Sequence, residues 1–350
     1  MSTSIRDILK HHPVTASAPC RIDSGGTWDI KALALPLELI EPVTINIALS
    51  LRTWVTLSPF KVGWVRISSE GISKGEQYHQ ENLPFNTPLG LYFAAVSHFG
   101  FHGLQVNIRS DSPVKSALGG SSTALIALIK ALSKVAFMLG QKRLYGGKLL
   151  SLGYHMEDGI SGGNCGMQDQ AAAVYGGVNL WKWRYGKGDS LFKRERLLDI
   201  EGQKELSERI LVAYSGESHV SARINRSWIH DFLSGKTRTG WLKANDIVHR
   251  LAGAIKHENW RKAASFLRDE TAVRKEITPN ALIPITEELI HQAETAGCGA
   301  RSAGAGAGGS IWALGEIKKI RDLRKIWEKT LSPIKRAKIL HCTVDPKGVR

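Results

Sequence analysis

A run of small and hydroxyl residues follows a strand-like segment near the middle of the chain. Leu104, Val106 and Ile108 alternate with polar residues, and a long apolar pattern typical of a helix begins near Ser121. The joint between them reads Gly119-Gly120-Ser121-Ser122-Thr123. Small residues let backbone N–H groups approach an anion, and the first turn of a helix leaves such groups unpaired. The segment therefore predicts a phosphate site whose hydroxyls bond phosphate oxygens or magnesium. The alternative is a Ser/Thr-capped helix after a glycine turn.

Two other glycine-containing segments match familiar nucleotide motifs only in part. Gly304-x-Gly306-x-x-Gly309 has the spacing of the dinucleotide fingerprint, but it follows a predicted helix and precedes a predicted strand. That fingerprint requires the strand first and the helix after it. Gly235-Lys236-Thr237 has the end of a Walker loop, but His230 stands where its first glycine belongs. We exclude a Rossmann site and a P-loop at these positions.

Three blocks of the chain, in this order, resemble the GHMP kinase superfamily. They are Ala18–Ile30, the loop Pro113–Ala124 and Gly304–Gly309, with Glu157 and Gly166-Met167-Gln168-Asp169-Gln170 between the last two. The pattern is similar to the sugar-kinase branch, which includes galactokinase, fucokinase and D-glycero-D-manno-heptose 7-phosphate kinase. The resemblance implies a two-lobed α+β fold, with a ribosomal-protein-like N-terminal lobe (residues 1–190) and a ferredoxin-like C-terminal lobe (residues 191–350). The active site is expected between the lobes.

The resemblance also implies ATP as phosphoryl donor and Mg²⁺ as its partner. The residues expected to bind the nucleotide are Pro113, Lys115, Leu118, Gly119, Gly120, Ser121, Ser122 and Thr123. Ser121 and Glu157 are the expected magnesium ligands, with Ser122 as the neighbouring option. Two protein ligands suffice because Mg²⁺ prefers hard oxygen atoms and keeps several waters. Without the resemblance, Glu157 would be interpreted as an exposed acid at a helix end.

Asp169 is the expected general base by the same resemblance. A carboxylate against the acceptor hydroxyl can orient that hydroxyl and accept its proton. Arg21 is expected beside it, where a guanidinium holds the carboxylate ionised or contacts the transferred phosphoryl group. On its own, Asp169 could simply cap the predicted helix over residues 167–175.

The acceptor is expected to be a sugar or sugar phosphate, held by both ends of the chain. The predicted substrate-binding residues are Asp23, Gly25, Gly26, Asp29, Gly304, Gly306 and Gly308. A carboxylate accepts two hydrogen bonds from adjacent hydroxyls, the Gly25-Gly26 turn brings backbone close to the ring, and Trp28 stacks on it. The alternative is a turn held by Asx bonds with Trp28 in the core. For residues 304–309 the alternative is a tight helix-to-strand connection.

Lys115 and Ala117 stand where the family usually has glycine. If position 117 requires a positive φ, a non-glycine residue there costs about 1 kcal/mol or more. Lys115 either reaches a nucleotide or substrate phosphate or points to solvent. The N-terminal motif is also one residue shorter than in heptose-phosphate kinases, which leaves the shape of the acceptor pocket open.

Three functions remain open. The first is ATP-dependent phosphorylation of a monosaccharide or its phosphate, with the anomeric hydroxyl among the candidates. The second is phosphorylation of a small non-sugar alcohol, against which the Asp29-bearing motif argues. The third is a nucleotide-binding or regulatory protein with reduced turnover, suggested only by Lys115 and Ala117. Retention of Arg21, Glu157 and Asp169 together weighs against the third.

Composition limits the partners and the compartment. The chain has 350 residues and a formal net charge of +15. Lys318 to Arg350 holds eleven Lys and Arg residues against three acids, a surplus of eight, so half of the excess is local. Ile317, Ile320, Leu323 and Trp327 recur there at helical spacing, so we expect a packed helix with a solvated basic face rather than a nucleic-acid site.

No apolar run approaches the roughly 20 residues that a spanning helix needs, and the four cysteines form no CxxC. We therefore expect a cytoplasmic monomer or homodimer with free thiols and no membrane partner.

The pattern along the chain predicts segregated strands and helices. Strands are expected at 44–57, 62–68, 103–110, 178–184, 209–215, 310–314 and 337–344. Helices are expected at 89–99, 121–139, 141–158, 167–175, 219–233, 240–256, 259–276 and 283–296. Residues 182–204 are interpreted as the crossover between lobes, and 297–309 as a loop.

Overall fold

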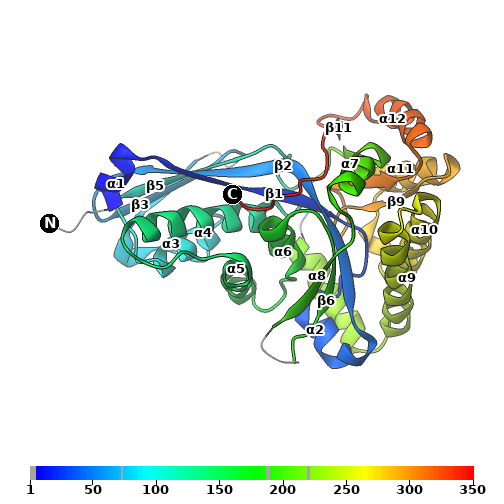
Figure 1. Cartoon of the computed structure of the whole chain (residues 1–350), viewed down its shortest axis with the longest axis horizontal. Helices are drawn as coiled ribbons and strands as arrows, with labels where there is room; N and C mark the ends of the chain where they lie inside the picture. Colours follow the sequence, from blue (N-terminus) through cyan, green and yellow to red (C-terminus); the bar gives the residue numbers. More distant parts are fainter. Residues whose placement is uncertain (1–4, 72–73, 187–189, 219–220) are drawn as a thin grey trace.

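The computed structural model describes residues 5–71, 74–186, 190–218 and 221–350, which form two sheets with helices packed against them (Figure 1). The strands are β1 (Val14–Asp23), β2 (Val43–Pro59), β3 (Trp64–Ser69), β4 (Glu76–His79), β5 (Leu104–Ser110), β6 (Val178–Trp183), β7 (Phe192–Arg196), β8 (Ile210–Tyr214), β9 (Gly299–Ser302), β10 (Ser310–Leu314) and β11 (Lys338–Leu340). The helices are α1 (Ile5–His11), α2 (Lys31–Ala34), α3 (Gly90–His98), α4 (Gly120–Met138), α5 (Gly146–Ile160), α6 (Gln168–Tyr175), α7 (Ile200–Arg209), α8 (Ser221–Leu233), α9 (Arg238–Lys256), α10 (Trp260–Ile277), α11 (Pro284–Thr295) and α12 (Ile317–Leu331). Three short 3-10 turns lie at Leu35–Ile40, Gln80–Asn82 and Pro279–Ala281.

The first sheet has the order β4-β3-β5-β2-β6-β7, with β1 paired to β2. Its pairs are antiparallel except β3 with β5. β1 and β2 form a long hairpin whose register shifts between Pro19 and Arg21. Such irregularities re-aim a side chain, and they occur often beside functional sites. Here the shift lies directly before Arg21.

α4 is the central helix of the N-terminal lobe. It packs on β1 and β2 and contacts α3, α5 and α6. Its apolar side chains, including Leu125 and Ile129, are fully buried. Contrary to the expectation from the sequence, Gly120–Met138 is long and apolar enough to cross a membrane. However, 72% of its most apolar window is buried inside the fold, as in the core helix of a globular domain.

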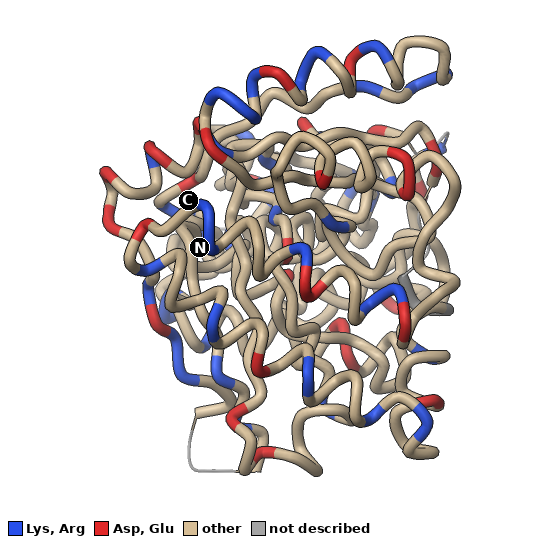
Figure 2. The backbone as a smooth tube through the Cα atoms, turned by 90° about the vertical axis from the view of Figure 1, so that its right-hand side faces the viewer, with Lys and Arg blue, Asp and Glu red and all other residues tan. Residues whose placement is uncertain are grey.

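The second sheet has the order β11-β8-β10-β9 and is antiparallel throughout. α10 and α11 pack against β9, and α9 pairs with α10. α12 buries Ile320, Leu323, Trp327 and Leu331 against this sheet, which confirms the predicted packed helix. Lysine and arginine alternate with acidic residues along its outer turns (Figure 2).

Two sequence predictions of local structure are corrected. Residues 182–204 do not form a simple crossover, because β7 within them pairs with β6 and extends the first sheet. Residues 297–309 are not entirely a loop, because Gly299–Ser302 forms β9, which pairs with β10. Glycine, alanine and serine have low strand propensity, so this strand exists because of its partner rather than its own residues.

Candidate active site

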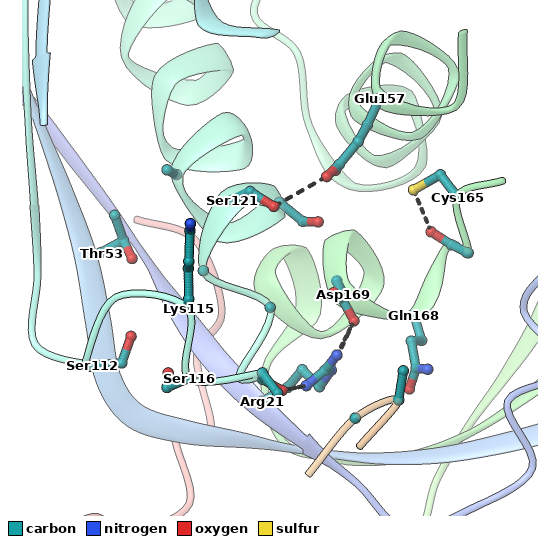
Figure 3. A pocket seen from close by; sticks show the side chains of 18 of the residues that line it. Arg21, Thr53, Ser112, Lys115, Ser116, Ser121, Glu157, Cys165, Gln168 and Asp169 are labelled. Carbon is teal, nitrogen blue, oxygen red and sulfur yellow. Dashed lines mark hydrogen bonds and ion pairs between the residues drawn. The ribbon is translucent and has the colours of Figure 1, made fainter. Parts of the chain in front are cut away.

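A cavity of about 490 Å³ lies where the N-terminal lobe meets the loop after β9. The loop before α4, the ends of α5 and α6, and residues 304–305 form its walls. The lining side chains that carry charge are Arg21, Asp23, Asp29, Glu70, Lys115, Glu157 and Asp169. Arg21, Ser121, Glu157 and Asp169, which are far apart in the sequence, therefore face one cavity (Figure 3).

The loop before α4 has the geometry of an anion cradle. Gly119 caps the helix with φ 75°, and no side chain provides a capping hydrogen bond. A Cβ atom on Gly119 would lie 3.1 Å from Cγ of Asp169, so the position requires glycine both for its φ and for its close neighbour. Gly120 and Ser121 are exposed at the first turn of α4. The alternative of a Ser/Thr-capped helix is not what the structure shows.

Lys115 and Ala117 adopt left-handed backbone conformations, with φ 56° and φ 62°. The sequence raised this possibility, since the family usually has glycine here. The carbonyl oxygen of Ala117 accepts a hydrogen bond from Arg21 Nη1 at 2.7 Å. Lys115 extends into the cavity (Figure 3). The strained loop thus places both a lysine and the arginine contact at the same wall.

Asp169 and Arg21 form the core of the site. Arg21 Nε and Nη2 each lie 2.7 Å from Asp169 Oδ1. Arg21 also donates to the carbonyl oxygens of Ala117 and Ala303, at 2.7 and 2.8 Å. Burial alone would lower the pKa of Arg21, but the carboxylates of Asp169 and Asp23 outweigh burial and raise it. Both contacts of Arg21 are to Asp169 Oδ1, so Oδ2 is the oxygen left for an incoming group.

Glu157 and Ser121 face each other across the cavity from α5 and α4. Ser121 Oγ donates to Glu157 Oε1 at 3.3 Å, and Gln170 Nε2 donates to Glu157 Oε2 at 2.6 Å. Burial, with a smaller contribution from the charge of Asp169, raises the pKa of Glu157 to about 7. Glu157 is thus half-buried rather than an exposed acid at a helix end.

The oxygen atoms of Ser121 and Glu157 fit a magnesium ion. They are hard donors, and a carboxylate with a raised pKa gains from a nearby cation. Among the described residues, no group of three or more His, Cys, Asp or Glu side chains is placed to hold a metal. Waters and nucleotide phosphates would have to supply the remaining ligands, as Mg²⁺ commonly allows.

The predicted acceptor turn is packed against the C-terminal lobe. The Gly25 N–H donates to Asp23 Oδ1 at 2.6 Å, which is the Asx turn of the alternative interpretation. A Cβ on Gly25 would lie 2.9 Å from Val248, and one on Gly26 would lie 2.0 Å from the carbonyl oxygen of Val43. Both glycines therefore lie outside the cavity lining, and their role in substrate binding stays a prediction.

Trp28 lies in the core and does not line the cavity, as in the alternative interpretation, which corrects the prediction that it stacks on the acceptor. Its side chain is fully buried and makes edge contacts with Phe232 and Trp241, at ring-centroid distances of 5.8 and 6.1 Å. A large aromatic residue next to a glycine turn is as suited to a core as to a sugar, and here the helices α8 and α9 enclose it.

Asp29 lies at the buried floor of the cavity. Its Oδ2 accepts from the backbone N–H of Gln168 at 3.1 Å, and its Oδ1 accepts from Gln168 Nε2 at 3.2 Å. Burial, followed by the charge of Asp169, raises the pKa of Asp29 to about 7. Asp29 therefore holds the first residue of α6, the helix that carries Asp169.

The remaining predicted residues divide into those on the cavity wall and those behind it. Pro113, Gly304 and Ser122 are on the wall. Leu118 and Thr123 are buried behind it, and Gly306 and Gly308 also lie outside the lining. Residues on the wall that sequence reasoning missed are Thr53, Ser112, Ser116, Asn164, Cys165, Gln168 and Asn225. Gln168 and Gln170 could have been found, since they flank Asp169 within the recognised motif.

Comparisons with known proteins place part of the chain in a known family model. Residues 86–177 match the family model described as the GHMP kinases N terminal domain. A comparison with curated proteins finds no significant match.

Solved structures match nearly the whole chain. Galactokinase from Lactococcus lactis, complexed with galactose, has a TM-score of 0.73 and 16% identity, covering 99% of this chain and 96% of that one. Mevalonate kinase from Methanococcus jannaschii has a TM-score of 0.71 and 17% identity, covering 95% and 99%. A D-glycero-D-manno-heptose 1-phosphate kinase from Bacteroides thetaiotaomicron has a TM-score of 0.68 and 16% identity, covering 96% and 98%. Residues 86–177 thus match the model of the GHMP kinases N terminal domain, and the chain as a whole has the fold that these solved kinases share.

Proposed function

We propose that this protein is an ATP-dependent kinase that phosphorylates a hydroxyl group of a monosaccharide or monosaccharide phosphate. The observation that carries the proposal is the convergence of Arg21, Ser121, Glu157 and Asp169 on one cavity. Phosphoryl transfer requires a cradle for phosphates, neutralisation of charge, a group that orients the attacking hydroxyl, and exclusion of water. The cavity provides residues suited to each of the first three, and its volume is within the range of small-molecule sites.

In the proposed mechanism, Asp169 receives the acceptor hydroxyl. Its carboxylate orients the hydroxyl oxygen toward the phosphoryl group and accepts the proton as the new O–P bond forms and the bond to the leaving diphosphate breaks. Arg21 fixes the position of Asp169 through two contacts to Oδ1. The backbone N–H groups at Gly119, Gly120 and Ser121 face the position of the nucleotide phosphates, with Lys115 beside them.

Ser121 and Glu157 would hold magnesium, which neutralises charge on the phosphates when bound. Gln170 fixes Glu157 by donating to Oε2, so that Oε1 and Ser121 Oγ remain on the cavity side. The raised pKa of Glu157 means that part of the population is protonated near neutral pH, and a bound cation would favour the ionised form.

A small non-sugar alcohol is the second candidate acceptor, because the fold is shared about equally with a galactokinase and a mevalonate kinase. Against reduced turnover, the charged residues at the centre of the site are in contact rather than scattered. The acceptor class is decided by a panel of free sugars, sugar phosphates and hydroxy acids incubated with ATP and Mg²⁺, with release of ADP as the readout.

The substitution Asp169→Asn tests the role of the base. It keeps the shape of the side chain and one acceptor for Arg21, but it cannot take a proton. We expect kcat to fall by about 10²- to 10⁴-fold while the Kd for ATP stays within twofold. Asp246→Asn, an exposed position on α9, is the matched control and should leave both constants unchanged. An unchanged kcat in Asp169→Asn would remove this residue as base, and no ADP release with any acceptor would contradict the proposed function.

A further inference from the structure

A second, smaller cavity adjoins the main one behind Gly304 and Ala305, which line both. Its volume is about 30 Å³. That is room for one or two waters or one small charged group, and far below the size of a complete ligand site. We call it the annex. Its lining residues come from α8, α10, the turn at 278–282 and the end of β9: Trp228, Glu270, Thr271, Arg274, Lys275, Thr278, Ala281, Leu282, Arg301, Ser302, Gly304 and Ala305.

The annex and the main cavity have opposite charge. The annex is lined by three cations, Arg274, Lys275 and Arg301, and one carboxylate, Glu270. The main cavity is lined by five carboxylates and two cations. An anionic group of a ligand in the main cavity would therefore be repelled by most of its wall and attracted toward the annex.

Arg274 provides the strongest evidence that the annex binds a ligand. Nine-tenths of its side chain is buried. Nε donates to Glu270 Oε1 at 2.8 Å, Nη2 donates to Thr27, and the guanidinium lies 4.2 Å from the ring centroid of Trp241. Nη1, however, has no hydrogen-bond partner among the described residues. A buried guanidinium nitrogen without a partner is unfavourable, and such a group calls for a water or a ligand.

Lys275 adds a second cation to the annex, and Thr27 links the annex to the main cavity. Lys275 is half-buried and makes no ion pair within the part of the chain that the structure describes, so its charge is free for a ligand. Thr27, the partner of Arg274, lines the main cavity. The annex is thus connected to the acceptor turn by a hydrogen bond as well as by the shared wall at Gly304.

We propose that the annex binds the anionic group of the acceptor, with Arg274 and Lys275 as its ligands, so that the substrate is a sugar phosphate or a sugar acid rather than a neutral sugar. This inference rests on the proposed function, because it names the class of acceptor for the same site. The small volume admits a phosphate or carboxylate but not a ring, so the reacting hydroxyl stays in the main cavity near Asp169. The nucleotide phosphates belong to the loop before α4, which does not line the annex.

Lys275→Met is the decisive variant, because Lys275 is half-buried and its loss leaves no buried partner unpaired. The assay compares a neutral sugar, its phosphate and the corresponding uronic acid, each with ATP and Mg²⁺. We expect the charged acceptor to be preferred. Its KM should rise ten- to a hundredfold in Lys275→Met, since a hydrogen bond to a charged group is lost. The kcat, the KM for ATP and the KM for the neutral sugar should stay within threefold.

Lys262→Met is the matched control, since it removes the same charge from an exposed position on the same helix. It should leave every constant unchanged. A direct probe needs no turnover: inorganic phosphate should raise the Tm of the wild type and of Lys262→Met, and raise it less in Lys275→Met. The phosphate and uronic acid arms distinguish which anion the annex accepts.

Failure of this inference differs from failure of the proposed function. A preference for the neutral sugar, or an unchanged KM of the charged acceptor in Lys275→Met, overturns the annex as an anion site while the kinase activity stands. An absence of transfer to every acceptor overturns the proposed function, and the thermal shift by phosphate then still decides whether the annex binds an anion. Equal shifts in all three proteins would mean that phosphate binds elsewhere on the protein, and they would overturn the inference.

Discussion

Two regions of the proposed site hold their charged residues in different ways. We call the wall around Ser121, Glu157 and Asp169 the transfer end. We call the turn at residues 23–26, together with Glu270 and Arg301, the acceptor end. At the transfer end, Glu157 faces hydroxyl and amide donors, makes no ion pair with a described residue, and has a pKa raised to about 7. At the acceptor end, Asp23 and Glu270 are buried more deeply, yet both lie 3.1 Å from Nη1 of Arg301. Burial alone would raise the pKa of Glu270, but Arg301 and Arg274 outweigh burial and lower it.

The two regions thus differ in which of their carboxylates have a cation beside them. At the transfer end Asp169 is paired with Arg21, but Glu157 has no cation beside it among the described residues, which suits the proposed uptake of a cation and a phosphorylated donor. The acceptor end pairs its own charges and so joins β1 and the acceptor turn to α10 and β9. Trp312 Nε1 adds a hydrogen bond to the backbone carbonyl of Asp23 at 2.9 Å.

The largest effect is expected from breaking the paired charges at the acceptor end. Arg301→Met removes the cation that Asp23 and Glu270 share, so that buried Asp23 loses its ion pair and Glu270 keeps only Arg274. We expect a loss of about 3–5 kcal/mol in the free energy of unfolding, measured by urea denaturation.

Arg261→Met is the matched control for that variant. Arg261 is 85% exposed and its ion pair with Glu316 spans 3.5 Å, so its removal should leave the free energy of unfolding unchanged within error. If Arg301→Met lost less than about 1 kcal/mol, the paired charges would not be what holds the acceptor turn, and the comparison between the two ends would fail.

The two ends also differ in how much of their structure could be predicted from the sequence. Gly119, Ser121, Glu157 and Asp169 lie in recognisable motifs, so the sequence predicts that they belong to one site. The resemblance was needed for this, because local pattern alone left a capped helix before α4 and an exposed acid at Glu157 as alternatives. The predicted bounds of α4 and α6 agree with the structure to within one residue, whereas α5, which carries Glu157, begins at Gly146 rather than at 141.

The acceptor end could not be predicted in this way. Glu270 and Arg274 stand four residues apart on α10, a spacing that usually indicates a surface ion pair. Nothing in the sequence indicates that this pair is buried or that Arg301 joins it from β9. Because these contacts connect distant segments, the same missing information also misplaced Trp28 as a stacking residue.

A pH-dependent difference is expected at Asp29, which is buried like Asp23 but has no ion-pair partner among the described residues. Its folded-state pKa of about 7 lies above the ordinary value of 3.8, so the folded protein holds a proton that the unfolded chain releases. The contribution of Asp29 to stability is therefore present at low pH and is lost as pH rises toward 7.

Asp29→Asn removes this titration. We expect the free energy of unfolding of the variant, relative to the wild type, to increase by a few kcal/mol, on the order of 2, between pH 5 and pH 8. Urea denaturation at several pH values measures it, and taking the difference cancels the other titrating groups. Parallel curves for the two proteins would mean that Asp29 is ionised throughout and that a cation compensates it after all.

The smallest effect is expected at Ala117, where the strain of the transfer end lies in the backbone rather than in the charges. Its φ of 62° disfavours a side chain by about 1–2 kcal/mol, whereas glycine adopts it freely. Glycine also gains more entropy on unfolding, which offsets roughly half of that benefit. We therefore expect Ala117→Gly to raise the free energy of unfolding by about 0.5–1 kcal/mol.

Ala272→Gly is the matched control, at an exposed position inside α10. It makes the same chemical change at a helical φ and should lower the free energy of unfolding by about 1 kcal/mol. Opposite signs for one substitution would show that the backbone conformation, not the lost methyl group, determines the result, whereas a loss of stability at both positions would mean that the loop before α4 is not strained.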